Sequence, residues 1–70
     1  MPAEAPSRQA RADAVRLERL RLRLDQKDIA EAAKLNQGTV SRAENGIGTD
    51  NVYEAIEDAL QRFKAEKADA

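Results

Sequence analysis

Three carboxylates, those of Asp25, Asp28 and Glu31, lie in one short segment, and paired carboxylates can act as a general acid and base. The sequence has no cysteine and no histidine, which excludes disulfides, thiolate catalysis, imidazole acid–base chemistry and histidine metal sites. No Gly-rich phosphate loop, metal-ligand spacing or nucleophile–base set accompanies the carboxylates. We therefore expect no enzymatic activity, no metal and no cofactor.

The segment that holds these acids, residues 25–46, has the pattern of two short helices around a tight turn. Asp25 is placed as the N-cap of the first helix, and Asp28 adds negative charge to its first turn, where the helix dipole favours it. Asn36 caps the second helix, and Gly46 suits a left-handed C-terminal position. Apolar residues recur at helical spacing at Ile29, Ala30, Ala33, Val40 and Ala43. The acids are therefore expected to be caps and exposed helix positions.

A longer pattern runs through this segment in one frame without a gap: Asp25-Gln26, Ile29-Ala30, Leu35-Asn36, Thr39-Val40-Ser41-Arg42 and Glu44-Asn45-Gly46. It resembles the helix-turn-helix of the lambda-type phage repressor, Cro and Xre family. That family runs from Ser/Asn-Gln-x-x-Leu-Ala through a Gly-containing turn to a Ser/Thr-rich recognition helix that ends in Glu-Asn-Gly. The resemblance covers about residues 15–63. It implies an all-α fold, a compact bundle of about four short helices.

The resemblance also implies roles for individual residues, because the family lays the second helix of the motif in the major groove of DNA and anchors the first across the backbone. The positions that face bases in the family are occupied by Gln37, Gly38, Ser41 and Arg42. The positions expected to meet phosphates are occupied by Gln26, Asn36, Thr39 and Asn45. Gln can pair with adenine at N6 and N7, and Arg can pair with guanine at O6 and N7. The alternative is that these are ordinary exposed polar residues.

A structural ion pair is implied as well, between Arg19 of the first helix and Glu44 of the recognition helix. We assign this pair to holding the two helices together and not to DNA contact. Four positions depart from the family. Lys34 and Arg23 stand where glycines are frequent, Gly38 removes a base-facing side chain, and Ile47 replaces a common phosphate-binding cation. A non-Gly residue at positive φ carries a steric cost.

Seventy residues allow one domain with a small core. We expect residues 1–6 to be a disordered N-terminus, residues 7–65 to be the helix-turn-helix DNA-binding domain, and residues 66–70 to be a charged C-terminal tail. The core is expected to contain Val15, Leu22, Leu24, Ile29, Ala30, Leu35, Val40 and Ala43, together with Val52, Ile56, Ala59, Leu60 and Phe63 of the last helix.

The first helix is expected to begin after Ser7 and to end near Leu22 or Arg23, and the last helix to begin at the cap residues 49–51. From Lys64 to Ala70 the apolar pattern is lost, which predicts fraying. If Val15 and Leu22 face the core, a second stripe formed by Leu17 and Leu20 needs another cover. The chain's own last helix or a second copy of the protein would provide it.

Charge is distributed unevenly along the chain although the net charge is only −1. Residues 1–24 hold six arginines and three acids, a balance of +3, whereas residues 50–70 hold three bases and six acids, a balance of −3. Solvated helix faces would explain most individual charges. No apolar run approaches the ~20 residues of a membrane span, and the N-terminus lacks the apolar centre of a signal peptide. We therefore expect no membrane association and a cytoplasmic location.

Taken together, these features predict a sequence-specific DNA-binding regulator of transcription, such as a phage-type repressor, a Cro-like protein or an excision control factor. It would read the major groove of double-stranded DNA with residues 37–44, as a weak homodimer or as a dimer formed on DNA. The alternative is an antitoxin-like protein-interaction module, which would sequester a partner protein through its acidic last helix or its apolar first helix.

Overall fold

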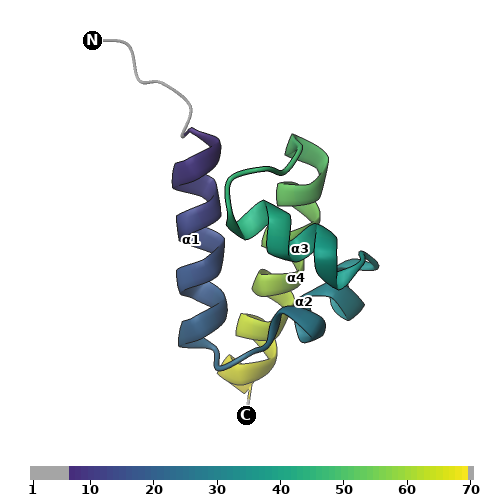
Figure 1. Ribbon diagram of the computed structural model, residues 1–70. Helices are drawn as coiled ribbons and strands as arrows, with labels where there is room; N and C mark the ends of the chain where they lie inside the picture. Colours follow the sequence, from purple (N-terminus) through teal and green to yellow (C-terminus); the bar gives the residue numbers. More distant parts are fainter. Residues whose placement is uncertain (1–6, 70) are drawn as a thin grey trace, which may run out of the picture.

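Four α-helices joined by short loops make up the fold of the computed structural model, which describes residues 7–69 (Figure 1). In chain order they are α1 (Arg8–Arg21), α2 (Gln26–Ala33), α3 (Gln37–Glu44) and α4 (Asp50–Asp69). The described part of the chain contains no strand. α4 packs against the other three helices, and α3 also contacts α1 and α2. The expected all-α bundle of four helices is confirmed, while residues 1–6, for which we expected disorder, lie outside the described residues.

The first two helices begin at the residues that the sequence marks as caps. The Ser7 hydroxyl accepts a hydrogen bond from the Ala10 backbone N–H at 3.1 Å. At the start of α2, the Asp28 carboxylate accepts from the backbone N–H of Asp25, the N-cap residue, at 2.9 Å. Asn36 occupies the N-cap of α3, but its side chain makes no capping hydrogen bond. The Asn36 side chain is therefore not committed to holding its own helix.

The last helix is longer than the apolar pattern predicted, because α4 continues to Asp69. We expected residues 64–70 to fray as a charged tail, but the helix continues through residue 69, and residue 70 lies outside the described residues. Lys, Glu and Ala are strong helix formers, so the helix outlasts its apolar face. Lys64 also reaches back to α1, where its ammonium lies 2.6 Å from the Glu18 carboxylate. No helix in the described residues is long and apolar enough to cross a membrane.

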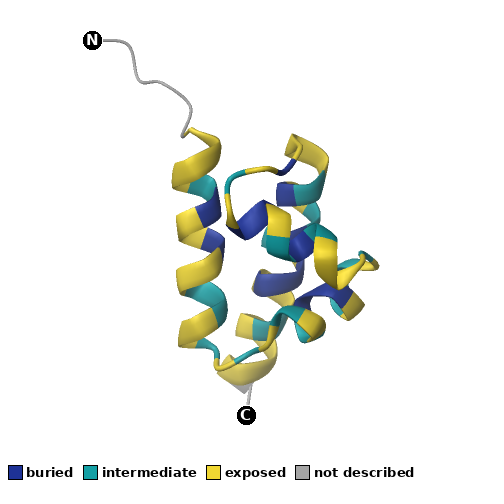
Figure 2. Ribbon diagram, in the orientation of Figure 1, coloured by how far each residue is buried: buried dark blue, intermediate teal, exposed yellow. Residues whose placement is uncertain are grey.

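Buried side chains from all four helices meet in one core, which Figure 2 shows on the facing sides of the helices. The buried residues are Ala12, Val15, Ile29, Ala30, Val40, Ala43, Tyr53, Ile56, Ala59 and Leu60. Those packed around them and partly buried are Leu22, Leu24, Leu35, Val52 and Phe63. Most of these residues were expected from the apolar pattern of the sequence, but Ala12 and Tyr53, both fully buried, were not.

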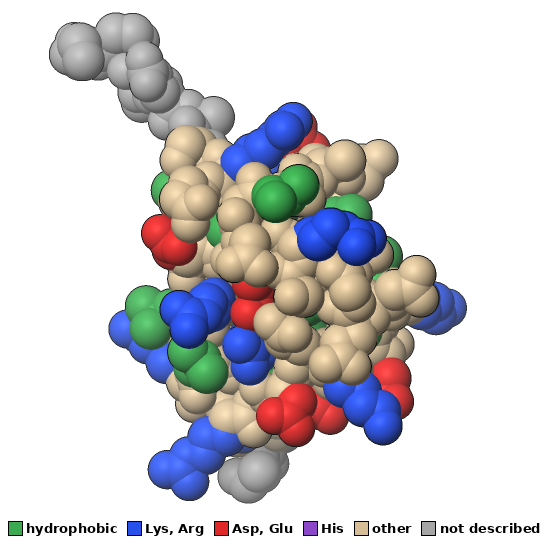
Figure 3. Space-filling view, viewed as in Figure 1, with side chains coloured by type: hydrophobic (Ala, Val, Ile, Leu, Met, Phe, Trp, Pro, Cys, Tyr) green, Lys and Arg blue, Asp and Glu red, His purple; other side chains and the backbone are tan. Residues whose placement is uncertain are grey.

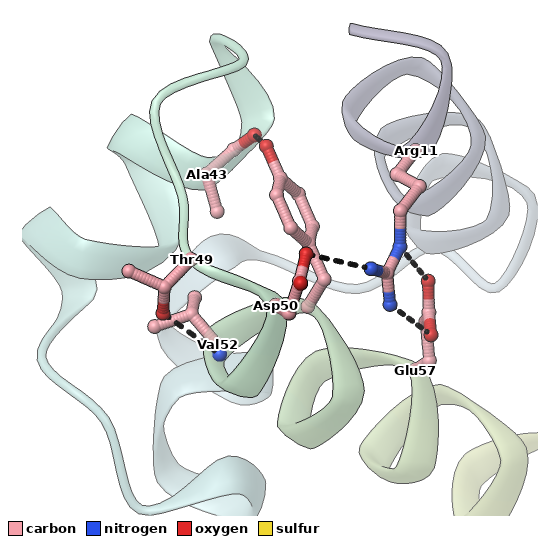
Figure 4. Close-up of polar contacts among 7 residues, drawn as sticks. Arg11, Ala43, Thr49, Asp50, Val52 and Glu57 are labelled. Carbon is pink, nitrogen blue, oxygen red and sulfur yellow. Dashed lines mark hydrogen bonds and ion pairs between the residues drawn. The ribbon is translucent and has the colours of Figure 1, made fainter. Parts of the chain in front are cut away.

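Tyr53 anchors α4 against the end of α3 (Figure 4). Its buried hydroxyl donates a hydrogen bond of 2.7 Å to the Ala43 carbonyl, which meets the requirement that a buried phenol has a partner. The ring lies so close to Gly48 that a Cβ there would stand 3.0 Å from two ring carbons. Beside it, the Thr49 hydroxyl accepts from the Val52 N–H at 3.3 Å and caps α4. The α3–α4 loop is therefore shaped around this ring.

Arg11 ties the N-terminal half of α1 to the same helix (Figure 4). Its guanidinium donates to both oxygens of Glu57, at 3.2 and 3.0 Å, and to Asp50 at 3.3 Å. Its central carbon lies 5.2 Å from the centre of the Tyr53 ring, within the range of a cation–π contact. One arginine of the basic N-terminal segment is therefore occupied within the fold.

Two non-glycine residues adopt the left-handed conformation, Arg23 and Lys34, each with φ 59°. Arg23 follows the C-cap of α1, Lys34 is the C-cap of α2, and both stand where the resemblance places glycines. Each turn is closed by a backbone hydrogen bond across it, from Leu24 N–H to Arg19 C=O at 3.1 Å and from Leu35 N–H to Ala30 C=O at 2.8 Å. A Cβ in this region costs about 1–2 kcal/mol. The surrounding helices hold both residues in this conformation.

Replacing Lys34 by glycine should raise the free energy of unfolding by about 0.5–1 kcal/mol, because glycine adopts positive φ without the steric cost. Lys34→Ala is the matched control, since it removes the same exposed side chain but keeps the Cβ. It should leave the stability unchanged or lower it. Urea denaturation of the three proteins measures the difference, and equal stabilities of the glycine and alanine variants would contradict the strain assigned to this turn.

Candidate nucleic-acid interface

α3 has one buried side and one exposed side, and the polar residues predicted to face bases lie away from the core. Val40, Ala43 and Glu44 are buried. Gln37, Gly38 and Arg42 are exposed, and Ser41 is partly exposed. Figure 3 looks onto this side of the molecule, where the surface over α3 is mostly neutral and Lys and Arg side chains surround it. The arrangement presents hydrogen-bonding groups on a short helix.

The Arg42 side chain lies along α3 towards the N-terminal end of the helix. Its Nη2 is 3.4 Å from the Thr39 hydroxyl, and a Cβ added at Gly38 would stand 3.7 Å from its Nη1. The hydrogen bond is long and exposed, so it restrains the guanidinium weakly. Most of the five donors of the guanidinium remain available for an acceptor outside the protein.

A buried ion pair holds the opposite side of α3 to α1. Arg19 donates from Nε and Nη2 to the two oxygens of Glu44, at 2.7 and 2.9 Å. Its Nη1 donates to the Leu24 carbonyl at 2.8 Å, in the loop after α1. The side chains of Arg19 and Glu44 are only 11% and 4% exposed. The hydrogen bond to Glu44 raises the pKa of Arg19 above its ordinary value, so Arg19 is charged across the physiological range. The predicted structural pair is confirmed.

Gln26 joins this ion pair, which the sequence analysis did not anticipate. The Gln26 side-chain amide donates to Glu44 Oε1 at 3.2 Å. Glu44 therefore accepts from α1 and α2 at once, while its own backbone belongs to α3. An amide nitrogen carries two hydrogens, so the second N–H of Gln26 stays free for another acceptor. Its predicted role as a phosphate ligand remains a prediction, and the only signal for the Glu44 contact was the position of both residues in the motif.

The other residues predicted to meet phosphates lie within α3 or at its ends. Thr39 accepts from Arg42, as described above. The Asn45 amide donates to the Ser41 carbonyl at 2.9 Å, at the C-terminal end of the helix. Asn36 is exposed at the N-terminal end. The structure therefore brings the predicted base-facing and phosphate-facing residues onto and around one helix, and their predicted contacts with DNA remain predictions.

The arginines of the basic N-terminal segment divide into two sets. Arg11 and Arg19 are held in the ion pairs described above, and Arg21, which is 70% exposed, stands 4.0 Å from a Glu18 oxygen. Arg8, Arg16 and Arg23 are exposed, and none of the three has an ion pair with another of residues 7–69. The free positive charge near the α1 surface is therefore smaller than the composition of that segment suggests. It still exceeds that of α3, where Arg42 is the one cation.

Comparison with known proteins identified no relative: no protein-family model matches the sequence, and neither a curated protein nor a solved structure is significantly similar to it.

The ion pair should contribute to stability as a coupled unit. Glu44→Gln should lower the free energy of unfolding by about 1–3 kcal/mol, because it leaves the largely buried Arg19 without its counter-charge. Arg19→Met should cost a similar amount. The double variant should cost less than the sum of the two, since neither charge is then left unpaired. Urea denaturation of the four proteins gives the coupling energy. A coupling energy indistinguishable from zero would mean that Glu44 is the last residue of α3 but does not stabilise the fold through Arg19.

Proposed function

We propose that this protein is a sequence-specific DNA-binding regulator of transcription, which reads the major groove with residues 37–44 of α3. The proposal rests on one observation, namely that α3 has a buried side and an exposed polar side. Its buried side is fixed to the core and to Arg19, while Gln37, Gly38 and Arg42 are exposed together on the other side. In helix-turn-helix proteins, a helix in this position enters the major groove of B-DNA.

Direct readout in this proposal comes from few groups. The Arg42 guanidinium can donate two parallel hydrogen bonds to O6 and N7 of guanine, and the Gln37 amide can pair with adenine at N6 and N7. The Ser41 hydroxyl can donate or accept. Because Gly38 lacks a side chain, the helix backbone can approach the base edges closely at that position. One copy of the protein therefore reads only a short half-site.

Phosphate contacts in the proposal come from the ends of α2 and α3. The N-terminus of α2 presents unpaired backbone N–H groups and the positive end of the helix dipole, which favour a phosphate oxygen. The free N–H of Gln26 lies at this end. Asn36, Thr39 and Asn45 would add contacts at the two ends of α3, and such contacts fix the register without reading sequence. With one cation on α3, we expect modest salt dependence.

The motif resemblance narrows the proposal to the class of phage-type repressors, Cro-like proteins and excision control factors of the lambda-type, Cro and Xre family. Such a protein would act in the cytoplasm, as a DNA-binding protein without catalytic activity. A second candidate function is supported by Leu17 and Leu20, which are 52% and 50% exposed on α1. An apolar surface of this kind would suit an antitoxin-like module that sequesters a partner protein.

Removal of a base-contacting side chain and removal of a phosphate-contacting side chain should have different effects on DNA binding. Arg42→Ala should cost about 1–3 kcal/mol on the preferred site and flatten the preference at one base pair, as expected for a lost bidentate contact. Asn36→Ala should weaken binding to all duplexes by a similar factor, because a phosphate contact carries no sequence information. Both residues are exposed, so both variants should remain folded.

The preferred site is first obtained by selecting bound duplexes from a random pool, and binding is then titrated on this site and on its single-base variants. Lys67→Ala on α4 is the matched control for the loss of one positive charge, since Lys67 is exposed and far along the chain from α3. A uniform loss for Arg42→Ala would contradict its role in readout. Failure of the wild-type protein to retain any duplex at low salt would contradict the proposed function.

A further inference from the structure

The outer side of α1 carries an apolar patch that the fold leaves uncovered. Leu17 and Leu20 are 52% and 50% exposed, whereas Ala12 and Val15 on the inner side of the same helix are buried. The alternative that the chain's own last helix covers these leucines is therefore wrong. Figure 3 shows hydrophobic side chains beside α1 with Lys and Arg side chains around them. The question is what covers this patch.

The charges beside the patch are arranged in a self-complementary order. Asp13, Leu17 and Arg21 stand four residues apart, so they lie above one another on one side of the helix. Asp13 is exposed, and among residues 7–69 it accepts only from Gln9, at 2.9 Å. Arg21 is 70% exposed, and its Nη1 stands 4.0 Å from a Glu18 oxygen, at the limit of an ion pair. Both charges are therefore available to an outside partner.

We propose that this side of α1 pairs with the same side of a second copy, antiparallel about a two-fold axis through Leu17. In this register Leu17 of one copy packs on Leu17 of the other, and Asp13 of each copy faces Arg21 of the other. The contact is isologous, so each ion pair forms twice. Pairing Leu17 with Leu20 of the second copy instead would set Arg16 opposite Arg21, and like charges in an interface are unfavourable. Charge complementarity therefore favours a second copy of the protein as the partner, in the register that places Leu17 opposite Leu17.

The pairing also has a consequence for α3. In Figure 1, α1 stands at the left edge with α3 beside it, and Figure 2 shows exposed residues along that left edge. A two-fold axis along the line of sight would place the second copy at this edge with its own α3 on the same face. Both α3 helices could then meet one duplex at two half-sites. This use of the pair rests on the proposed function, whereas the pairing itself does not.

Two half-exposed leucines and two ion pairs make a small interface, so the free protein should pair weakly, with half of it dimeric at roughly 0.1–1 mM. On a duplex with two half-sites, the first copy would raise the local concentration of the second into the millimolar range. Weak pairing in solution is therefore sufficient for cooperative binding.

Charge reversal tests the register in the free protein. Asp13→Arg alone sets positive charges against each other at both contacts, and Arg21→Asp alone sets negative charges against each other. Each variant should lower the association constant about tenfold or more, because two contacts are lost at once. A one-to-one mixture of the two variants brings opposite charges together at both contacts and should associate as strongly as the wild type. The double variant Asp13→Arg/Arg21→Asp should do the same.

Sedimentation equilibrium measures these constants, and circular dichroism establishes that each variant is folded. Glu66→Arg and Lys67→Glu change the net charge by the same amounts, from −1 to +1 and to −3, at exposed positions of α4. Neither they nor their mixture should differ from the wild type. Leu17→Glu should abolish association without unfolding the protein, since its side chain is half exposed.

A wild-type protein that stays monomeric at about 1 mM would overturn the proposal. So would a mixture of Asp13→Arg and Arg21→Asp that associates no better than either variant alone. Loss of fold in Leu17→Glu would place that leucine in the monomer's own core and would also overturn it. Association of the wild type with the expected charge dependence, together with no DNA binding, would support the pairing and contradict only the proposed function.

Discussion

The buried carboxylate of Glu44 is the point on which the arrangement of the helices depends. It accepts from Arg19 of α1 at 2.7 and 2.9 Å and from Gln26 of α2 at 3.2 Å, while its own backbone ends α3. Three helices thus share one charged group that cannot be left unpaired without a large desolvation cost. Hydrogen bonds are directional, so this network restricts the rotation of α3 more than apolar packing alone would.

The same pair determines which side of α3 faces outwards. Glu44 is the one acid of α3, and burial against Arg19 keeps its charge away from the exposed side. That side then presents Gln37, Ser41 and Arg42, which suit base edges, without a negative charge that would repel phosphates. Tyr53 fixes the same end of α3 to α4, because its hydroxyl donates a hydrogen bond to the Ala43 carbonyl, one residue before Glu44. The polar contacts thus orient α3, and the small core holds it in place.

The sequence predicted the parts of this structure that local pattern determines. Cap residues such as Ser7 and the motif positions of Arg19 and Glu44 specified helix starts and one tertiary contact. Tyr53 was missed because it stands near a helix start, where burial depends on how α3 and α4 meet. The length of α4 was missed because helix propensity, not an apolar face, extends it to Asp69. Whether the last helix covers Leu17 could not be predicted from the sequence, since it depends on where α4 crosses α1.

Nuclear magnetic resonance of the isotopically labelled protein, titrated with a short duplex of mixed sequence at low salt, tests the central claim most directly. If α3 lies in the groove and α2 meets the backbone, backbone amide shifts should concentrate at the start of α2 and along residues 36–45, and added salt should reduce them. Shifts confined to the outer side of α1 or to α4, or no shifts at all, would contradict the assignment of α3 as the DNA-reading helix.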